Sequence, residues 1–77
     1  MKNHYQVVMS ASLPQIVHEL EKARDNHIYN KSFINKLGAK LELKMMNIVQ
    51  HSYSIPRDQV IQYANGQEIL KSLYKYN

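Results

Sequence analysis

The stretch QYANGQEIL, residues 62–70, places an Asn65-Gly66 pair between two segments that each carry a helical pattern. An Asn-Gly pair is a strong local signal for a turn. The apolar residues before the pair lie on one side of a helical wheel, and those after it lie on roughly the opposite side. The first set is Val60, Ile61 and Ala64, and the second set is Ile69, Leu70, Leu73 and Tyr74.

One regular helix cannot bury both sets against one core, because opposite sides of a helix face opposite directions. Two residues contribute about 200° of rotation. A break or bulge that absorbs two residues at Asn65-Gly66 would therefore bring both sets onto one face. We predict a helix over residues 56–64, a break, and a fourth helix or a continuation of the third over 67–76. The alternative is an unbroken helix that buries opposite faces against two partners, one of them a second subunit.

The first helix is predicted over residues 12–24. Ser12 is a suitable cap, and Pro14 is tolerated in a first turn because its missing N–H would be unpaired there. Apolar residues follow at the spacing of a single buried face; they are Leu13, Ile16, Val17 and Leu20. Residues 25–30 are rich in polar side chains and read as a connecting loop.

The second and longest helix is predicted over residues 31–50, with Asn30 or Ser32 as its cap. Gly38 falls within its apolar stripe, where it either allows a neighbouring helix to approach closely or is simply tolerated. After a turn over residues 51–55, Pro56 begins the next helix, with Ser54 as the nearest capping hydroxyl.

Together these patterns predict an all-α domain of three to four short helices, in which the second and third helices form an antiparallel hairpin. Residues 1–11 are interpreted as an extended arm that pairs with a second copy or stays flexible. The predicted core contains Ile16, Val17, Leu20, Ile34, Leu37, Leu41, Met45, Ile48, Val60, Ile61, Leu70 and Leu73.

The composition limits the function classes. The chain has 77 residues, so it holds one domain, and it has no cysteine, which excludes disulfides and thiolate metal sites. No apolar run approaches the roughly 18 residues of a membrane span, and the first residues are too polar for a secretory signal, so we expect a cytoplasmic protein. The four histidines show no metal-ligand spacing, and no glycine-rich phosphate loop is present. We therefore expect no metal and no cofactor.

The formal net charge of +4 is compatible with an anionic partner. Lys36, Lys40 and Lys44 recur every four residues and form a ridge beside the apolar stripe of the second helix. Such a ridge is either a solvated face or a site for phosphate, nucleic acid or an acidic surface. A basic nucleic-acid-binding module is therefore one alternative function.

From about Ile34 onward the chain carries a pattern with three parts. An apolar, a basic and a methionine residue come first, a pair of β-branched apolar residues follows, and a Gln-Glu motif with apolar and tyrosine residues after it comes last. The positions are Leu41, Lys44 and Met45, then Val60 and Ile61, then Gln67, Glu68, Ile69, Leu73 and Tyr76. This half of the chain resembles the small sporulation-control aspartyl-phosphate phosphatases of Bacillus-type bacteria, which are two-helix hairpins. Gly66 stands in place of the family's signature serine and Leu70 in place of its aspartate.

The resemblance implies a bacterial regulatory protein that binds a response regulator of a phosphorelay through a helical face. It implies a protein aspartyl-phosphate phosphatase if activity is retained with Leu70 at the acid position. The partner-binding residues that we single out are Gln67, Glu68, Lys71, Tyr63 and Tyr74. An immunity- or inhibitor-type helical bundle is a further alternative, and a homodimer is a hypothesis motivated by the small core and the six tyrosines.

Overall fold

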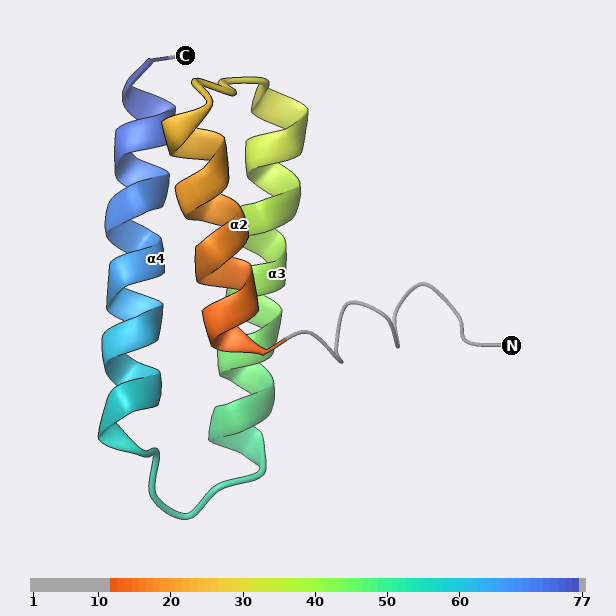
Figure 1. Ribbon diagram of the computed structural model, residues 1–77. Coiled ribbons are helices and arrows are strands. Elements are labelled where there is room, and N and C mark those ends of the chain that lie inside the picture. Colours follow the sequence, from red (N-terminus) through yellow and green to blue (C-terminus); the bar gives the residue numbers. More distant parts are fainter. Residues whose placement is uncertain (1–11, 77) are drawn as a thin grey trace.

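The computed structural model describes residues 12–76, which form three helices: α2 (Leu13–Asp25), α3 (Lys31–Gln50) and α4 (Arg57–Lys75). In Figure 1, α3 and α4 run in opposite directions as a hairpin, and α2 packs against both. The predicted all-α fold and its antiparallel hairpin are therefore confirmed. The arm predicted over residues 1–11 lies outside the described residues.

Local signals at both ends explain where α2 begins and ends. The Gln15 backbone N–H donates to Ser12 Oγ at 3.3 Å, and the Ser12 N–H donates to Gln15 Oε1 at 2.9 Å, which together form a capping box. At the other end, His27 adopts a left-handed backbone conformation (φ 54°). That turn lets the Ile28 N–H donate to the Ala23 carbonyl at 2.9 Å, so the helix stops with its last carbonyls satisfied.

The starts of α3 and α4 differ in how they are capped. Asn30 Oδ1 accepts a hydrogen bond of 3.0 Å from the Phe33 N–H, so Asn30 is the cap of α3 and Ser32 is not. At α4 the residue before the helix is Pro56, and no side chain caps the helix. The prediction that Ser54 supplies a capping hydroxyl is therefore wrong.

The predicted break at Asn65-Gly66 is also wrong. α4 is one continuous helix from Arg57 to Lys75, and neither glycine of the chain has a positive φ. The segments predicted separately over 56–64 and 67–76 are thus halves of a single helix. Gly66 is buried, and it faces Leu41 of α3 and Leu20 of α2. Its small size serves the packing of three helices, and its turn propensity is not used.

The core lies where all three helices run side by side. Eight of the predicted core residues are buried: Ile16, Val17, Leu20, Ile34, Leu37, Leu41, Leu70 and Leu73. Leu13, Ala23 and Ile69 join them, and Met45 and Ile48 pack against this cluster while half-buried. Val60 and Ile61 were predicted in the core and are exposed. They lie on the outer side of the unbroken α4, opposite the buried side.

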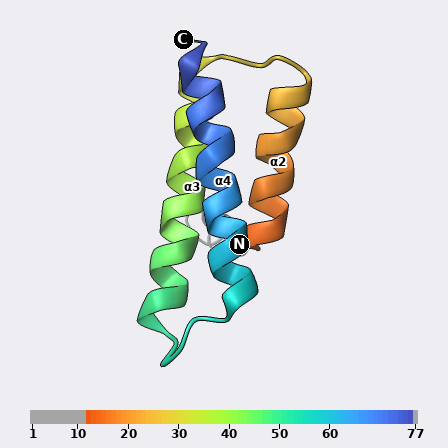
Figure 2. The ribbon, with the colours of Figure 1, turned by 90° about the vertical axis from the view of Figure 1, so that its left-hand side faces the viewer.

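The α3–α4 hairpin is longer than α2. α2 has 13 residues, whereas α3 has 20 and α4 has 19. In Figures 1 and 2, α3 and α4 continue past the N-terminal end of α2, so among residues 12–76 no third helix lies beside the end of the hairpin. We call residues 42–65 the hairpin tip. No residue of the hairpin tip is fully buried.

Candidate protein-interaction surface

Two pairs of side chains bridge α3 and α4 along one line. The Tyr63 hydroxyl donates to the Glu42 carboxylate at 2.7 and 2.9 Å. Two turns nearer the start of α3, the Tyr74 hydroxyl donates to Asn35 Oδ1. Residues seven apart on a helix share an edge, so Asn35 and Glu42 mark one edge of α3 and the two tyrosines mark the facing edge of α4. We call this line the α3–α4 seam.

Gln67 completes a polar cluster at the middle of the seam. Its Nε2 atom donates to Glu42 Oε1 at 2.9 Å and lies 2.6 Å from the Tyr63 hydroxyl. The pKa of Tyr63 is raised above its ordinary value, mainly because the phenol donates to Glu42, with smaller effects from burial and from the negative charge of the carboxylate. The cluster therefore holds the two helices together while Tyr63 stays neutral.

Shallow depressions lie on either side of this cluster along the seam. One is lined by Glu42, Met45, Met46, Val49, Gln50 and Tyr63, and the other by Gln67, Leu70, Lys71 and Tyr74. Both are wide open to solvent, and their surfaces are largely apolar. Sites for small molecules normally enclose most of the ligand, so this shape fits a protein segment better than a metabolite.

The structure brings together most of the partner-binding residues predicted from the sequence. Tyr63, Gln67, Lys71 and Tyr74 all line the seam. Glu68 lies within 3.6 Å of the Lys71 ammonium, and both side chains are highly exposed. Glu42 and Asn35 were not predicted, because isolated polar residues at a helix edge give no sign of a partner on another helix.

The hairpin tip carries several exposed apolar side chains. Met46 and Val49 of α3 are 55% and 50% exposed, and Val60 and Ile61 of α4 are 46% and 50% exposed. Met46 and Val49 line the depression beside Glu42 and Tyr63, whereas Val60 and Ile61 line neither depression.

The three lysines of the predicted ridge differ in their surroundings. Lys36 is exposed, whereas the Lys40 ammonium lies 3.8 Å from the Glu19 carboxylate of α2. Lys44 is half-buried and has an interaction partner of its own. Part of the positive charge of the ridge is thus used to hold the helices together.

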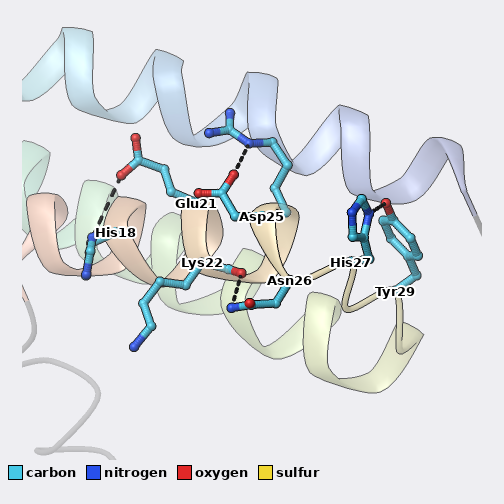
Figure 3. A network of polar contacts seen from close by, with 8 residues as sticks. His18, Glu21, Lys22, Asp25, Asn26, His27 and Tyr29 are labelled. Atoms are coloured by element: carbon cyan, nitrogen blue, oxygen red, sulfur yellow. Dashed lines mark hydrogen bonds and ion pairs between the residues drawn. The ribbon is translucent and has the colours of Figure 1, made fainter.

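Local polar contacts occur around the end of α2. Figure 3 shows the polar contacts around the end of α2, where His18 lies 3.9 Å from Glu21 and His27 Nδ1 lies 3.0 Å from the Tyr29 hydroxyl. Over residues 12–76, no three metal-ligating side chains converge.

Within the same range, no helix combines the length and apolar character needed to cross a bilayer.

Comparison of the chain with protein-family models, curated proteins and solved structures finds no match.

Proposed function

We propose that the protein is a small helical interaction module, which binds an amphipathic helix of a partner protein along the α3–α4 seam. The observation that carries this proposal is the pair of open, largely apolar depressions aligned on one seam. An amphipathic helix binds by laying apolar side chains, spaced about one turn apart, into such a groove. The polar cluster between the depressions offers Glu42 and Gln67 to fix the orientation of the bound helix.

The composition of the seam supports the same reading. Tyr63 and Tyr74 lie beside the depressions, and tyrosine is enriched at interfaces because it combines an apolar ring with a hydrogen-bonding tip. Both hydroxyls are held by bonds to α3. Side chains that are already ordered lose little further entropy on binding, so the seam is prepared for a partner.

The resemblance of residues 34–77 to regulator-binding hairpins makes a response regulator the first partner to test. We propose binding without hydrolysis, because Leu70 stands at the family's acid position. Leu70 packs near Gly38, with both its methyl groups 3.7 Å from where a Cβ of Gly38 would lie. This position therefore offers methyl groups and no carboxylate to a bound phosphoryl group.

A binding assay with purified receiver domains, phosphorylated by acetyl phosphate, tests the proposal. We expect Lys71→Glu to weaken binding at least tenfold, because Lys71 lines the depression formed with Gln67, Leu70 and Tyr74. Lys36→Glu is the matched control: it changes the net charge equally, but Lys36 lines neither depression. The lifetime of the phosphoryl group should be the same with and without the protein.

The outcomes separate the alternatives. If no receiver domain binds and affinity capture from the host cell retains no protein, the proposal is wrong. If Lys36→Glu abolishes binding to DNA or RNA, and that binding falls steeply with salt, the lysine ridge is a nucleic-acid site instead.

A further inference from the structure

We infer that Asn65 is a site of spontaneous deamidation that the fold keeps unreactive, and that reaction there makes unfolding irreversible. Asn65 is the only asparagine of the chain that is followed by glycine. In an unfolded chain such an asparagine loses its side-chain amide faster than others do, because glycine has no Cβ atom to hinder the attacking backbone nitrogen. The inference is independent of the proposed function, since it concerns the covalent structure of α4.

The nucleophile in this reaction is the backbone nitrogen of Gly66. The nitrogen gives up its proton to solvent and attacks Asn65 Cγ, a C–N bond forms, and the side-chain amide nitrogen takes up a proton and leaves as ammonia. The product is a five-membered succinimide ring. Water then hydrolyses one of the two C–N bonds that close the ring. One bond gives aspartate, and the other gives isoaspartate, in which the main chain runs through Cβ and Cγ of residue 65.

The unbroken α4 prevents the first of these steps. Asn65 and Gly66 lie near the middle of the helix Arg57–Lys75. There the Gly66 N–H donates to the carbonyl group four residues earlier, so its nitrogen is not free to attack. Ring closure also requires a ψ angle at Asn65 far from the helical value of about −42°. The Asn65 side chain is exposed to solvent, but α4 must open before the amide can react.

The isoaspartate product does not fit the folded bundle. It adds one atom to the main chain directly before Gly66, where α4 comes closest to the other two helices. Even a Cβ atom on Gly66 would lie 2.9 Å from Leu41 Cδ2 and 3.5 Å from Leu20 Cδ1. Both leucines are fully buried, so they have little room to move aside for a displaced backbone.

The extra atom also changes the register between the two halves of α4. Tyr63 precedes the modified residue and Gln67 follows it, and they donate to the Glu42 carboxylate at 2.7 and 2.9 Å. Both reach the same carboxylate because they lie one helical turn apart on one face. An insertion between them breaks this spacing. We therefore expect the isoaspartate form to lose the polar cluster as well as the packing at Gly66.

Parallel incubation of the full chain, folded in buffer and unfolded in guanidinium chloride, tests the inference. Trypsin releases residues 58–71, whose only asparagine is Asn65, and mass spectrometry measures the loss of its amide. We expect the loss to be at least about tenfold slower in the folded protein, because only opened molecules react. Across a denaturant series the rate should follow the unfolded fraction. Asn47, which precedes isoleucine, is the internal control and should react slowly in both states.

Asn65→Asp is the matched control for the product. It carries the same added negative charge as isoaspartate but leaves the main chain unchanged. It should fold with nearly wild-type stability, because residue 65 is exposed. The aspartate and isoaspartate forms of the incubated protein are separated by chromatography and transferred to buffer, and circular dichroism with a urea titration measures their refolding. We expect the aspartate form to match Asn65→Asp, and the isoaspartate form to remain unfolded or to unfold at a lower urea concentration.

Two results would overturn the inference. One is an equal rate of amide loss at Asn65 in the folded and the unfolded protein. The other is an isoaspartate form that refolds as stably as Asn65→Asp. Neither result affects the proposed function, which is read from the binding of a partner and its response to Lys71→Glu.

Discussion

Gly66 of α4 and Leu41 of α3 lie so close that a Cβ atom on Gly66 would come within 2.9 Å of Leu41 Cδ2. Leu41 is fully buried and therefore has little room to move aside. Leu20 of α2 reaches the same point, with its Cδ1 atom 3.5 Å from that position. This close approach of three helices explains why a glycine occurs in the middle of α4.

We predict that Gly66→Ala lowers the free energy of unfolding by up to about 2 kcal/mol. Alanine gains about 1 kcal/mol from helix propensity, but overpacking a core costs about 1–3 kcal/mol. Urea denaturation, followed by circular dichroism, measures the difference.

Gly38→Ala provides the comparison within the same bundle. A Cβ atom on Gly38 would lie 3.7 Å from the Leu70 methyl groups, which is an ordinary contact. The helix propensity of alanine is then gained without strain, and the free energy of unfolding should rise by about 0.5–1 kcal/mol. If both variants shift stability in the same direction, close packing is not the reason for Gly66.

Much of the fold was predictable because its signals are local. The predicted helix over residues 31–50 has the observed bounds, and the one over 12–24 differs from the observed α2 by one residue at each end. The prediction for α4 failed for a tertiary reason: it assumed that every apolar side chain is buried in one core. In the unbroken α4, Val60 and Ile61 lie opposite the side that carries Gly66, Ile69, Leu70 and Leu73, so they are exposed.

The candidate interaction surface was less predictable than the fold. Four of its residues were identified, but the bonds that organise it join Glu42 to Tyr63 and Gln67, more than 20 positions away. Which residues meet across the hairpin depends on the register of α3 against α4. The loop over residues 51–56 and the packing at Gly66 set this register, and neither is encoded in a local pattern.

The cap of α3 gives a second prediction, because the sequence allowed either Asn30 or Ser32. Asn30→Ala should cost about 1 kcal/mol of unfolding free energy, since its Oδ1 satisfies the Phe33 N–H. Ser32→Ala should change stability by less than about 0.5 kcal/mol. Thermal or urea unfolding of both variants measures the effect, and an equal loss in Ser32→Ala would contradict the assignment of Asn30 as the cap.

The Tyr63–Glu42 bond gives a pH prediction. The pKa of Tyr63 is raised in the folded protein because the phenol donates to Glu42. The folded state therefore holds this proton more tightly than the unfolded state does. The stabilisation is fully present below the unfolded pKa of about 10 and is lost as pH rises through the higher folded pKa. Stability measured by urea titration should fall across this alkaline window.

Tyr63→Phe isolates this contribution from those of the other tyrosines. The variant should lose up to about 1 kcal/mol at neutral pH, because the bond is accessible to solvent. Its difference from the wild-type protein should shrink above the folded pKa of Tyr63, where the wild type has also lost the bond. A difference that stays constant with pH would show that the hydroxyl does not depend on Glu42.

The aromatic pair at the opposite end of the bundle gives the last prediction. The rings of Tyr29 and Tyr76 stack with their centroids 4.8 Å apart, which joins the loop after α2 to the end of α4. A double-mutant cycle of Tyr29→Ala and Tyr76→Ala should give a coupling energy of about 0.5–1.5 kcal/mol. Tyr53→Ala is the control, because that ring is fully exposed and its change should be additive with Tyr29→Ala. A coupling energy near zero between Tyr29 and Tyr76 would mean that the stacking of the two rings does not stabilise the C-terminal end of α4.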